Sequence, residues 1–234
     1  MAKITVGYWD IRGLAEPIRY LLHFKNVPFE DKRYQFGDKT WENEKFTLGL
    51  DFPNLPYYID DKVKLTQSTT ILRHLAEKYG MDGKTEEEKL RVSLAEQQIV
   101  DFRMKFFMTV FSPLDFEKTK KEYLEKVPDQ LKFISAFLGN RKFLAGDYVT
   151  YVDFMAYETF DFNVLLSQNI LDDFPALKAY HERIRNLPEL EAYFNSTTYV
   201  RWPIVAPFAA WGGKIDEVKS ESLEDHATKC DGAL

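Results

Sequence analysis

Residues 4–13 have the sequence ITVGYWDIRG, a short β-prone run that ends at a polar turn. A stretch with helical spacing follows over residues 14–23, and residues 29–34 then alternate like a second strand. A proline-flanked turn leads into a predicted hairpin over residues 57–66, and an amphipathic helix covers residues 71–79. The predicted order is therefore a βαβ unit, a hairpin and a helix, with one more short helix expected at Trp41–Leu48.

Helical periodicity dominates the rest of the chain. Long periodic segments cover Leu90–Phe111 and Tyr123–Leu138, and Pro128 is expected to kink or split the second of them. Thr150 and Asp153 are spaced as a capping box ahead of another helix. The sequence thus predicts a small α/β domain followed by a larger all-α domain.

We expect four segments along the chain. Their predicted bounds are an α/β domain at residues 1–83, a charged linker at 84–88, an all-helical domain at 89–213 and a tail at 214–234. The tail holds three lysines against six acidic residues, so it carries half of the formal charge of −6. We expect it to be disordered or loosely attached.

The composition excludes several classes of protein. Hydrophobic residues make up 45% of the 234 positions, which is ordinary for a globular chain, and no basic stripe favours a nucleic-acid partner. No apolar run approaches the ~18 residues that a membrane helix needs, and the N-terminus has no apolar signal region, so we expect a cytoplasmic protein. Cys230 is the only cysteine, so a disulfide within one chain is impossible, and a cysteine nucleophile would require this residue to fold back into a site.

Common catalytic signatures are absent. The sequence contains no GxGxxG, Walker-type or GxSxG motif. The four histidines are scattered, without the paired spacing of a metal site: His23, His74, His181 and His226. We therefore expect no bound metal.

Polar residues lie at the predicted ends of elements. Tyr8 is either a half-buried strand aromatic or a phenol that donates a hydrogen bond to an anion at the sheet edge. Ser68 is either an ordinary N-cap or, with Gln67, part of a helix N-terminus that binds a carboxylate. The Leu55–Pro56 step enters a predicted strand. A cis peptide bond before proline is rare by default, but here it would expose the Leu55 backbone to a peptide-like ligand. Spacing alone leaves a soluble two-domain protein that is a candidate to bind a small anion.

Longer motifs indicate which kind of protein this is. Their order along the chain resembles that of mu-class glutathione transferases: GYWDIRGL at residues 7–14, NEKFTLGLDFPNLPY at 43–57, LTQS at 65–68, and FLAGD with VTYVDF at 143–154. The resemblance covers most of residues 4–213. It implies a thioredoxin-like N-terminal domain and a C-terminal helical bundle, the glutathione transferase fold.

The resemblance implies an enzyme that adds the glutathione thiolate to hydrophobic electrophiles. Tyr8 takes the role of the catalytic tyrosine, whose hydroxyl donates a hydrogen bond to the glutathione sulfur. A free thiol with a pKa of about 8.5 is mostly protonated at neutral pH, and such a bond contributes roughly 1.5–3 kcal/mol toward the thiolate. Because the nucleophile comes with glutathione as cosubstrate, no further cofactor and no protein cysteine are implied.

The same resemblance assigns the binding residues. Those implied to contact glutathione are Trp9, Trp41, Lys45, Asn54, Leu55, Gln67, Ser68 and, from the partner subunit, Asp101. Those implied to line an apolar second-substrate pocket are Ile11, Leu14, Met104, Met108, Phe111 and Ala206. Without the family, Asp101 is a solvated helix position, and the stripe of Met104, Met108 and Phe111 is ordinary core.

Two departures from the family pattern bear on this site. Phe111 stands near a position where many mu-class members carry a tyrosine, so it lacks a hydroxyl to assist the reaction. The loop at residues 37–41 is shorter than in vertebrate members and resembles that of invertebrate members, with Asp38 where an arginine is common.

The resemblance further implies a homodimer. Phe52 matches an aromatic key that inserts between helices of the partner, and Arg73 matches a residue near the two-fold axis. Two other functions stay open: a non-catalytic carrier of apolar ligands, and reduction of organic hydroperoxides as a side activity of the same site. The retention of Tyr8, Lys45 and Gln67 favours the transferase over the carrier.

Overall fold

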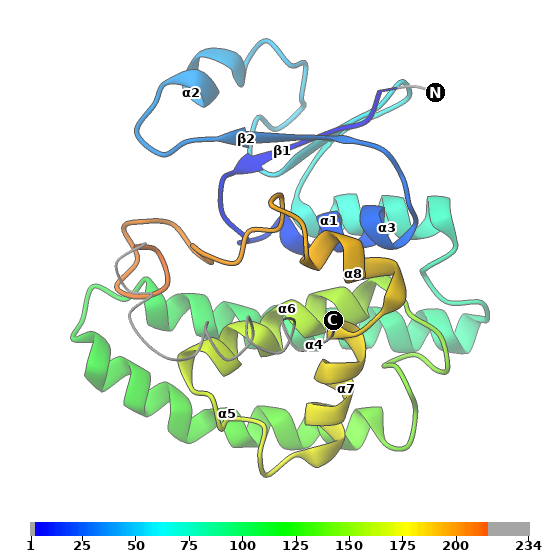
Figure 1. Ribbon diagram of the computed structural model, residues 1–234, viewed down its shortest axis with the longest axis vertical. Coiled ribbons are helices and arrows are strands. Elements are labelled where there is room, and N and C mark those ends of the chain that lie inside the picture. Colours follow the sequence, from blue (N-terminus) through cyan, green and yellow to red (C-terminus); the bar gives the residue numbers. More distant parts are fainter. Residues whose placement is uncertain (1–2, 215–234) are drawn as a thin grey trace, which may run out of the picture.

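A computed structural model of the chain describes residues 3–214. Its first part is a four-stranded sheet in the order β2-β1-β3-β4, shown at the top of Figure 1. The strands are β1 (Thr5–Trp9), β2 (Glu30–Tyr34), β3 (Tyr57–Ile59) and β4 (Lys64–Thr66). β1 pairs in parallel with β2 and antiparallel with β3, as a βαβ unit followed by a hairpin requires.

Helices cover and flank this sheet. They are α1 (Glu16–Phe24), which connects the parallel strands, α2 (Thr40–Glu44) and α3 (Ser68–Tyr79). Gly7 in β1 lies under the ring of Tyr57, where an added Cβ would meet the ring at 2.2 Å. Glycine at this position therefore leaves room for the Tyr57 ring to lie over β1 where β1 and β3 pair.

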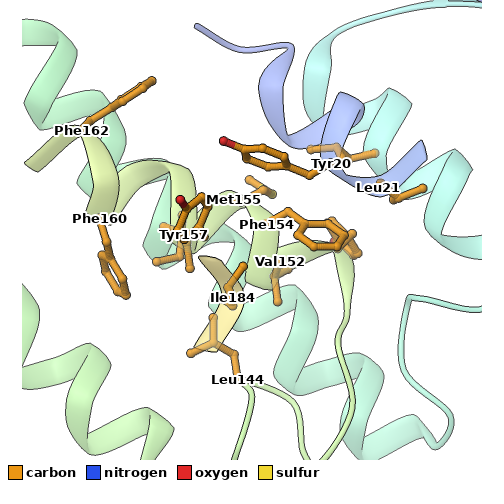
Figure 2. Packing of buried hydrophobic residues seen from close by; sticks show 14 of the residues in the cluster. Tyr20, Leu21, Leu144, Val152, Phe154, Met155, Tyr157, Phe160, Phe162 and Ile184 are labelled. Carbon is orange, nitrogen blue, oxygen red and sulfur yellow. The ribbon is translucent and has the colours of Figure 1, made fainter. Parts of the chain in front are cut away.

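In the second part of the described chain, every regular element is a helix. Its helices are α4 (Glu86–Val110), α5 (Phe116–Leu138), α6 (Tyr151–Leu166), α7 (Pro175–Arg185) and α8 (Pro188–Phe194). α6 is buried on nearly every face, and Tyr20 and Leu21 of α1 pack over its residues Phe154 and Met155 (Figure 2). One apolar core thus joins the two parts through α1 and α6.

The capping box predicted before α6 is confirmed. The carboxylate of Asp153 accepts hydrogen bonds from the backbone N–H and the hydroxyl of Thr150, both at 2.8 Å. It also accepts from the N–H of Leu144 at 2.9 Å and from the hydroxyl of Tyr180 at 2.7 Å. This buried carboxylate therefore fixes the start of α6 and the loop before it.

Some element bounds differ from the predictions. α5 is a single helix that contains Pro128, so the proline does not split it, and it begins before the predicted segment, at Phe116. α4 begins at Glu86 because Thr85 and Glu88 form a second capping box, which draws part of the charged segment into the helix. α2 ends at Glu44 rather than at Leu48.

No helix within residues 3–214 is long and apolar enough to cross a membrane. The predicted tail and Cys230 lie outside the described residues.

Candidate functional site

Tyr8 lies in β1 with its side chain only 6% exposed. Its hydroxyl accepts a hydrogen bond from the backbone N–H of Leu14 at 3.2 Å. Burial raises the pKa of Tyr8 above its ordinary value, against the lowering effects of the Leu14 N–H and of the Arg19 and Arg103 guanidinium groups. The phenol is therefore protonated at neutral pH and retains its proton for donation to another acceptor.

A tight turn brings the backbone close to this hydroxyl. Gly13 has φ +47°, and a Cβ on it would lie 2.7 Å from the Tyr8 oxygen. The turn is held from the C-terminal part of the chain, because Arg12 N–H donates to Pro203 O at 3.2 Å and Gly13 N–H to Ile204 O at 2.9 Å. Glycine is thus required where the turn passes the phenol, and residues 203–204 set the position of that turn.

The Leu55–Pro56 peptide bond is cis, which confirms the presumed cis-Pro56. Leu55 belongs to the same apolar cluster as Tyr8, Ile11 and Trp41. In this structure the Leu55 N–H donates to the side-chain oxygen of Asn54 at 2.9 Å. A peptide-like ligand that pairs with Leu55 would therefore lie beside Tyr8 and next to Asn54.

Gln67 and Ser68 lie at the N-terminus of α3. The N-cap is Gln67, and Ser68 is the first helical residue, so the reading of Ser68 as an ordinary N-cap is wrong. Gln67 has φ +70° and ψ 107° and makes no capping bond with its side chain. A non-glycine residue in this conformation is strained, and such strain is common at ligand-binding positions. Because the side chain of Gln67 does not cap the helix, the N-terminus of α3 is available to an external anion.

Three further residues implied in glutathione binding lie at the end of β1, within α2 and directly after α2. Trp41 is buried against the rings of Tyr34 and Tyr57, with centroids 5.4 and 6.1 Å away. Lys45 follows α2, and its Nζ lies 5.0 Å from the ring of Phe46. Trp9 packs against the Tyr8 cluster. The structure gathers Tyr8, Trp9, Trp41 and Leu55 in one cluster.

The expected second-substrate residues come from three segments. Ile11 belongs to the Tyr8 cluster, and Leu14 packs against it. Met104 and Met108 are exposed on α4, and Phe111, which caps that helix, is 39% exposed. The alternative reading of this stripe as core is therefore wrong, because a core stripe would be buried.

Ala206 is buried in the segment of residues 199–213, which crosses from α8 toward the end of α4 (orange in Figure 1). The hydrogen bonds of Pro203 and Ile204 to the turn beside Tyr8 join this segment to the same region. It therefore lies between the sheet domain and α4.

Residues expected at a subunit interface lie elsewhere. Phe52 is 72% exposed, and Asp101 is exposed on α4. Arg73 pairs with Glu96, which also accepts a hydrogen bond from the hydroxyl of Tyr151 at 2.6 Å. An apolar pocket of about 250 Å³ lies between α4 and α5, lined by Leu94, Ala95, Gln98, Phe133, Phe137 and Leu144 among others.

Sequence reasoning missed one residue beside Tyr8, Arg103, and two rings that contact Trp9 and Phe111. Arg103 on α4 is buried, and its Nη1 has no hydrogen-bond partner among the described residues. Phe36 stacks on Trp9, and Phe208 contacts both Phe36 and Phe111. These contacts join distant segments of the chain, so no local sequence pattern indicates them.

Comparison with known proteins defines the class. The family model for the glutathione S-transferase N-terminal domain matches residues 4–77, and the model for the C-terminal domain matches residues 100–197. The chain belongs to the glutathione S-transferase family.

Its relatives place it in the mu class. The chain is 47% identical to glutathione S-transferase Mu 1 of Oryctolagus cuniculus over 216 residues, 90% of this chain and 99% of the relative. It is 45% identical to glutathione S-transferase Mu 4 of Homo sapiens over 218 residues, 91% of this chain and 100% of the relative. The chain is thus a glutathione transferase of mu class.

Solved structures share the fold. The glutathione S-transferase Blo t 8 superposes with a TM-score of 0.83 at 38% identity, covering 89% of this chain and 99% of that one. A Pi-class glutathione S-transferase of Onchocerca volvulus superposes with a TM-score of 0.80 at 28% identity, covering 88% of this chain and 99% of that one. The thioredoxin-like domain followed by a helical domain is therefore confirmed.

Proposed function

We propose that Tyr8 activates glutathione for attack on hydrophobic electrophiles. The observation that carries this proposal is the buried Tyr8 hydroxyl, which accepts a bond from the Leu14 N–H and keeps its own proton. Lowering a thiol pKa from about 8.5 by about two units requires ~2.7 kcal/mol of preference for the thiolate. One hydrogen bond to a charged acceptor contributes roughly 1.5–3 kcal/mol, so the Tyr8 phenol supplies most of that preference.

The proposed reaction consumes no reactant beyond glutathione and the electrophile. The thiol proton leaves to solvent, the sulfur forms a bond to the electrophilic carbon, and a halide departs when the substrate is a halogenated aromatic. Because the nucleophile arrives with glutathione, we propose that no metal or bound cofactor takes part.

The rest of the glutathione site follows from the same proposal. Gln67 and Ser68 hold the γ-glutamyl carboxylate at the N-terminus of α3, and Leu55 pairs with the cysteinyl backbone. The glycyl end lies against Trp41, Lys45 and Asn54, and the Lys45 ammonium neutralises its carboxylate. The positive φ of Gln67 and the cluster around Tyr8 support this arrangement.

The assay that tests the proposal is conjugation of glutathione to 1-chloro-2,4-dinitrobenzene. With Tyr8→Phe, kcat/KM at pH 6.5 is expected to fall roughly 50-fold, because the thiolate fraction falls from about half to about 1%. The glutathione KM is expected to stay within about twofold. No conjugation by the native enzyme, despite glutathione binding, would contradict the proposal.

We also propose that the enzyme is a homodimer in which Phe52 of each subunit enters the pocket between α4 and α5 of the other. An exposed phenylalanine and an apolar pocket on the same chain support this pairing, because a two-fold axis makes each contact twice. Asp101 then reaches the γ-glutamyl amine bound by the neighbouring subunit. We place the enzyme in the cytoplasm, in keeping with its single cysteine.

A further inference from the structure

A series of aromatic rings runs from the Tyr8 cluster to the end of α4. Trp9 and Phe36 are stacked with centroids 4.4 Å apart, and Phe36 meets Phe208 edge-on at 6.2 Å. Phe208 in turn lies 5.6 Å from Phe111. The series therefore connects the glutathione-binding domain with the helix that carries the expected electrophile pocket.

Phe208 is 77% exposed, although it contacts a ring on either side. A side chain with so little of its surface buried contributes little to stability, because apolar stabilisation follows the area removed from water. Phe111 at its side is also exposed. These rings have surface left to contact a ligand.

The backbone around Phe208 is held firmly. Ala210 N–H donates to the carbonyl of Val110 at 2.7 Å, and Ala209 N–H donates to Ala206 O at 3.0 Å. The same segment holds the turn at Gly13 that passes the Tyr8 hydroxyl. The ring of Phe208 is thus carried by a segment fixed both to α4 and to the turn beside the proposed catalytic phenol.

We propose that Phe36 and Phe208 are specificity-determining residues that select electrophiles with a flat aromatic ring. Aromatic rings prefer offset-stacked or edge-on contacts with centroids 4.5–7 Å apart, close to the spacings in this series. A planar substrate can extend the series, whereas a saturated ring of similar size gains only apolar contact. This inference rests on the proposed function, since it concerns the second substrate of the Tyr8 site.

The test compares benzyl isothiocyanate with cyclohexylmethyl isothiocyanate. In both, the glutathione sulfur bonds to the central carbon of the isothiocyanate, the nitrogen takes up a proton, and no group leaves. Both molecules carry seven carbons beyond the reacting group, so they differ mainly in whether the ring is flat. The ratio of their kcat/KM values therefore reports the contribution of ring contacts, once the uncatalysed rates are subtracted.

The variants are Phe208→Leu and Phe36→Leu, which keep apolar bulk without a ring, and Phe208→Tyr, which keeps the ring. We expect each leucine variant to lower the benzyl-to-cyclohexylmethyl ratio roughly 3- to 10-fold, and Phe208→Tyr to keep it within twofold. The kcat/KM of Phe208→Leu is expected to fall less with the cyclohexylmethyl compound than with the benzyl compound, and its glutathione KM is expected to stay within twofold of the native value.

Two results would overturn the inference. An unchanged benzyl-to-cyclohexylmethyl ratio in both leucine variants would show that the rings do not select, and if both kcat/KM values also fall equally, the rings only support the fold of the site. If the native enzyme binds glutathione but conjugates neither compound, the proposed function itself fails.

Discussion

The role of Tyr8 was the most predictable feature of the site at the scale of single residues. Its place at the end of a strand and within the GYWDIRGL motif predicted a phenol beside a ligand, and the fold places it buried next to Leu55. The sequence does not show the N–H of Leu14 bonded to the phenol, because that contact depends on how the turn at Gly13 closes. The sequence also does not predict the strained backbone of Gln67, since glutamine has no particular preference for positive φ.

Replacing Gln67 by glycine is expected to affect glutathione binding and the free energy of unfolding in opposite directions. In Gln67→Gly the left-handed conformation loses its steric strain, so the free energy of unfolding is expected to rise by about 1 kcal/mol. The glutathione KM is expected to rise about tenfold, because the side chain that holds the γ-glutamyl end is lost. Urea unfolding and steady-state kinetics measure the two effects.

Asn26 provides the matched control, because it is the other non-glycine residue with positive φ in the described part of the chain, at 50°. In Asn26→Gly the glutathione KM is expected to stay unchanged. A glutathione KM that is also unchanged in Gln67→Gly would remove Gln67 from the site.

At the scale of elements, capping and turn chemistry were the most predictable features. The Thr150–Asp153 box and the hairpin turn at residues 60–62 lie where the sequence indicates them, because both depend on bonds between near neighbours. The exact start of α4 at Glu86 and the unbroken course of α5 through Pro128 were not predicted. Packing against α4 and α7 maintains α5 where local preference would end it.

The turn between β3 and β4 makes stability depend on pH. The Asp60 carboxylate accepts bonds from the N–H groups of Lys62 and Val63 at 2.9 Å and from Lys78 Nζ at 2.8 Å. Burial opposes its ionisation, but the Lys78 ammonium and these N–H groups outweigh burial and hold the pKa of Asp60 well below its usual range. Asp60 therefore contributes stability that is present above pH ~5 and lost as pH falls through the ordinary aspartate value toward the folded one.

Asp60→Asn tests this dependence. At pH 7 its free energy of unfolding is expected to lie about 2 kcal/mol below that of the native enzyme, and the gap is expected to narrow as pH falls from 5 toward 2. Urea titrations at equal protein concentration measure the gap, since the stability of the proposed dimer depends on concentration. A gap that stays constant across this range would contradict the assignment.

At the scale of the whole molecule, buried charges tie the two domains together. Arg12, in the turn beside Tyr8, donates to both carboxylate oxygens of Glu158 at 3.0 and 2.6 Å and to Asp161 at 2.6 Å. The hydroxyl of Tyr193 donates to Glu16 at the start of α1. The sequence predicted two domains but not these links, since each joins positions far apart along the chain.

The proposed dimer gives the whole-molecule prediction. The native enzyme is expected to sediment at twice the 27.5 kDa mass of the chain, whereas Phe52→Ser is expected to dissociate at micromolar concentration. The glutathione KM of Phe52→Ser is expected to rise, because Asp101 of the neighbour is lost. Sedimentation velocity and steady-state kinetics measure these effects.

Phe46→Ser is the control for this prediction, because Phe46 is as exposed as Phe52 but has no assigned place at the interface. It is expected to remain dimeric. A native enzyme that sediments as a monomer, or dissociation of both variants alike, would contradict the assignment of Phe52.

The pKa of the glutathione thiol bound to the enzyme tests the central claim most directly. It is measured by titrating the ultraviolet absorbance of the thiolate in the complex, for the native enzyme and for Tyr8→Phe. We predict a thiol pKa of about 6.5 in the native complex and about 8.5 in Tyr8→Phe, a change worth ~2.7 kcal/mol. Equal thiol pKa values in the two complexes would show that the Tyr8 hydroxyl does not stabilise the thiolate.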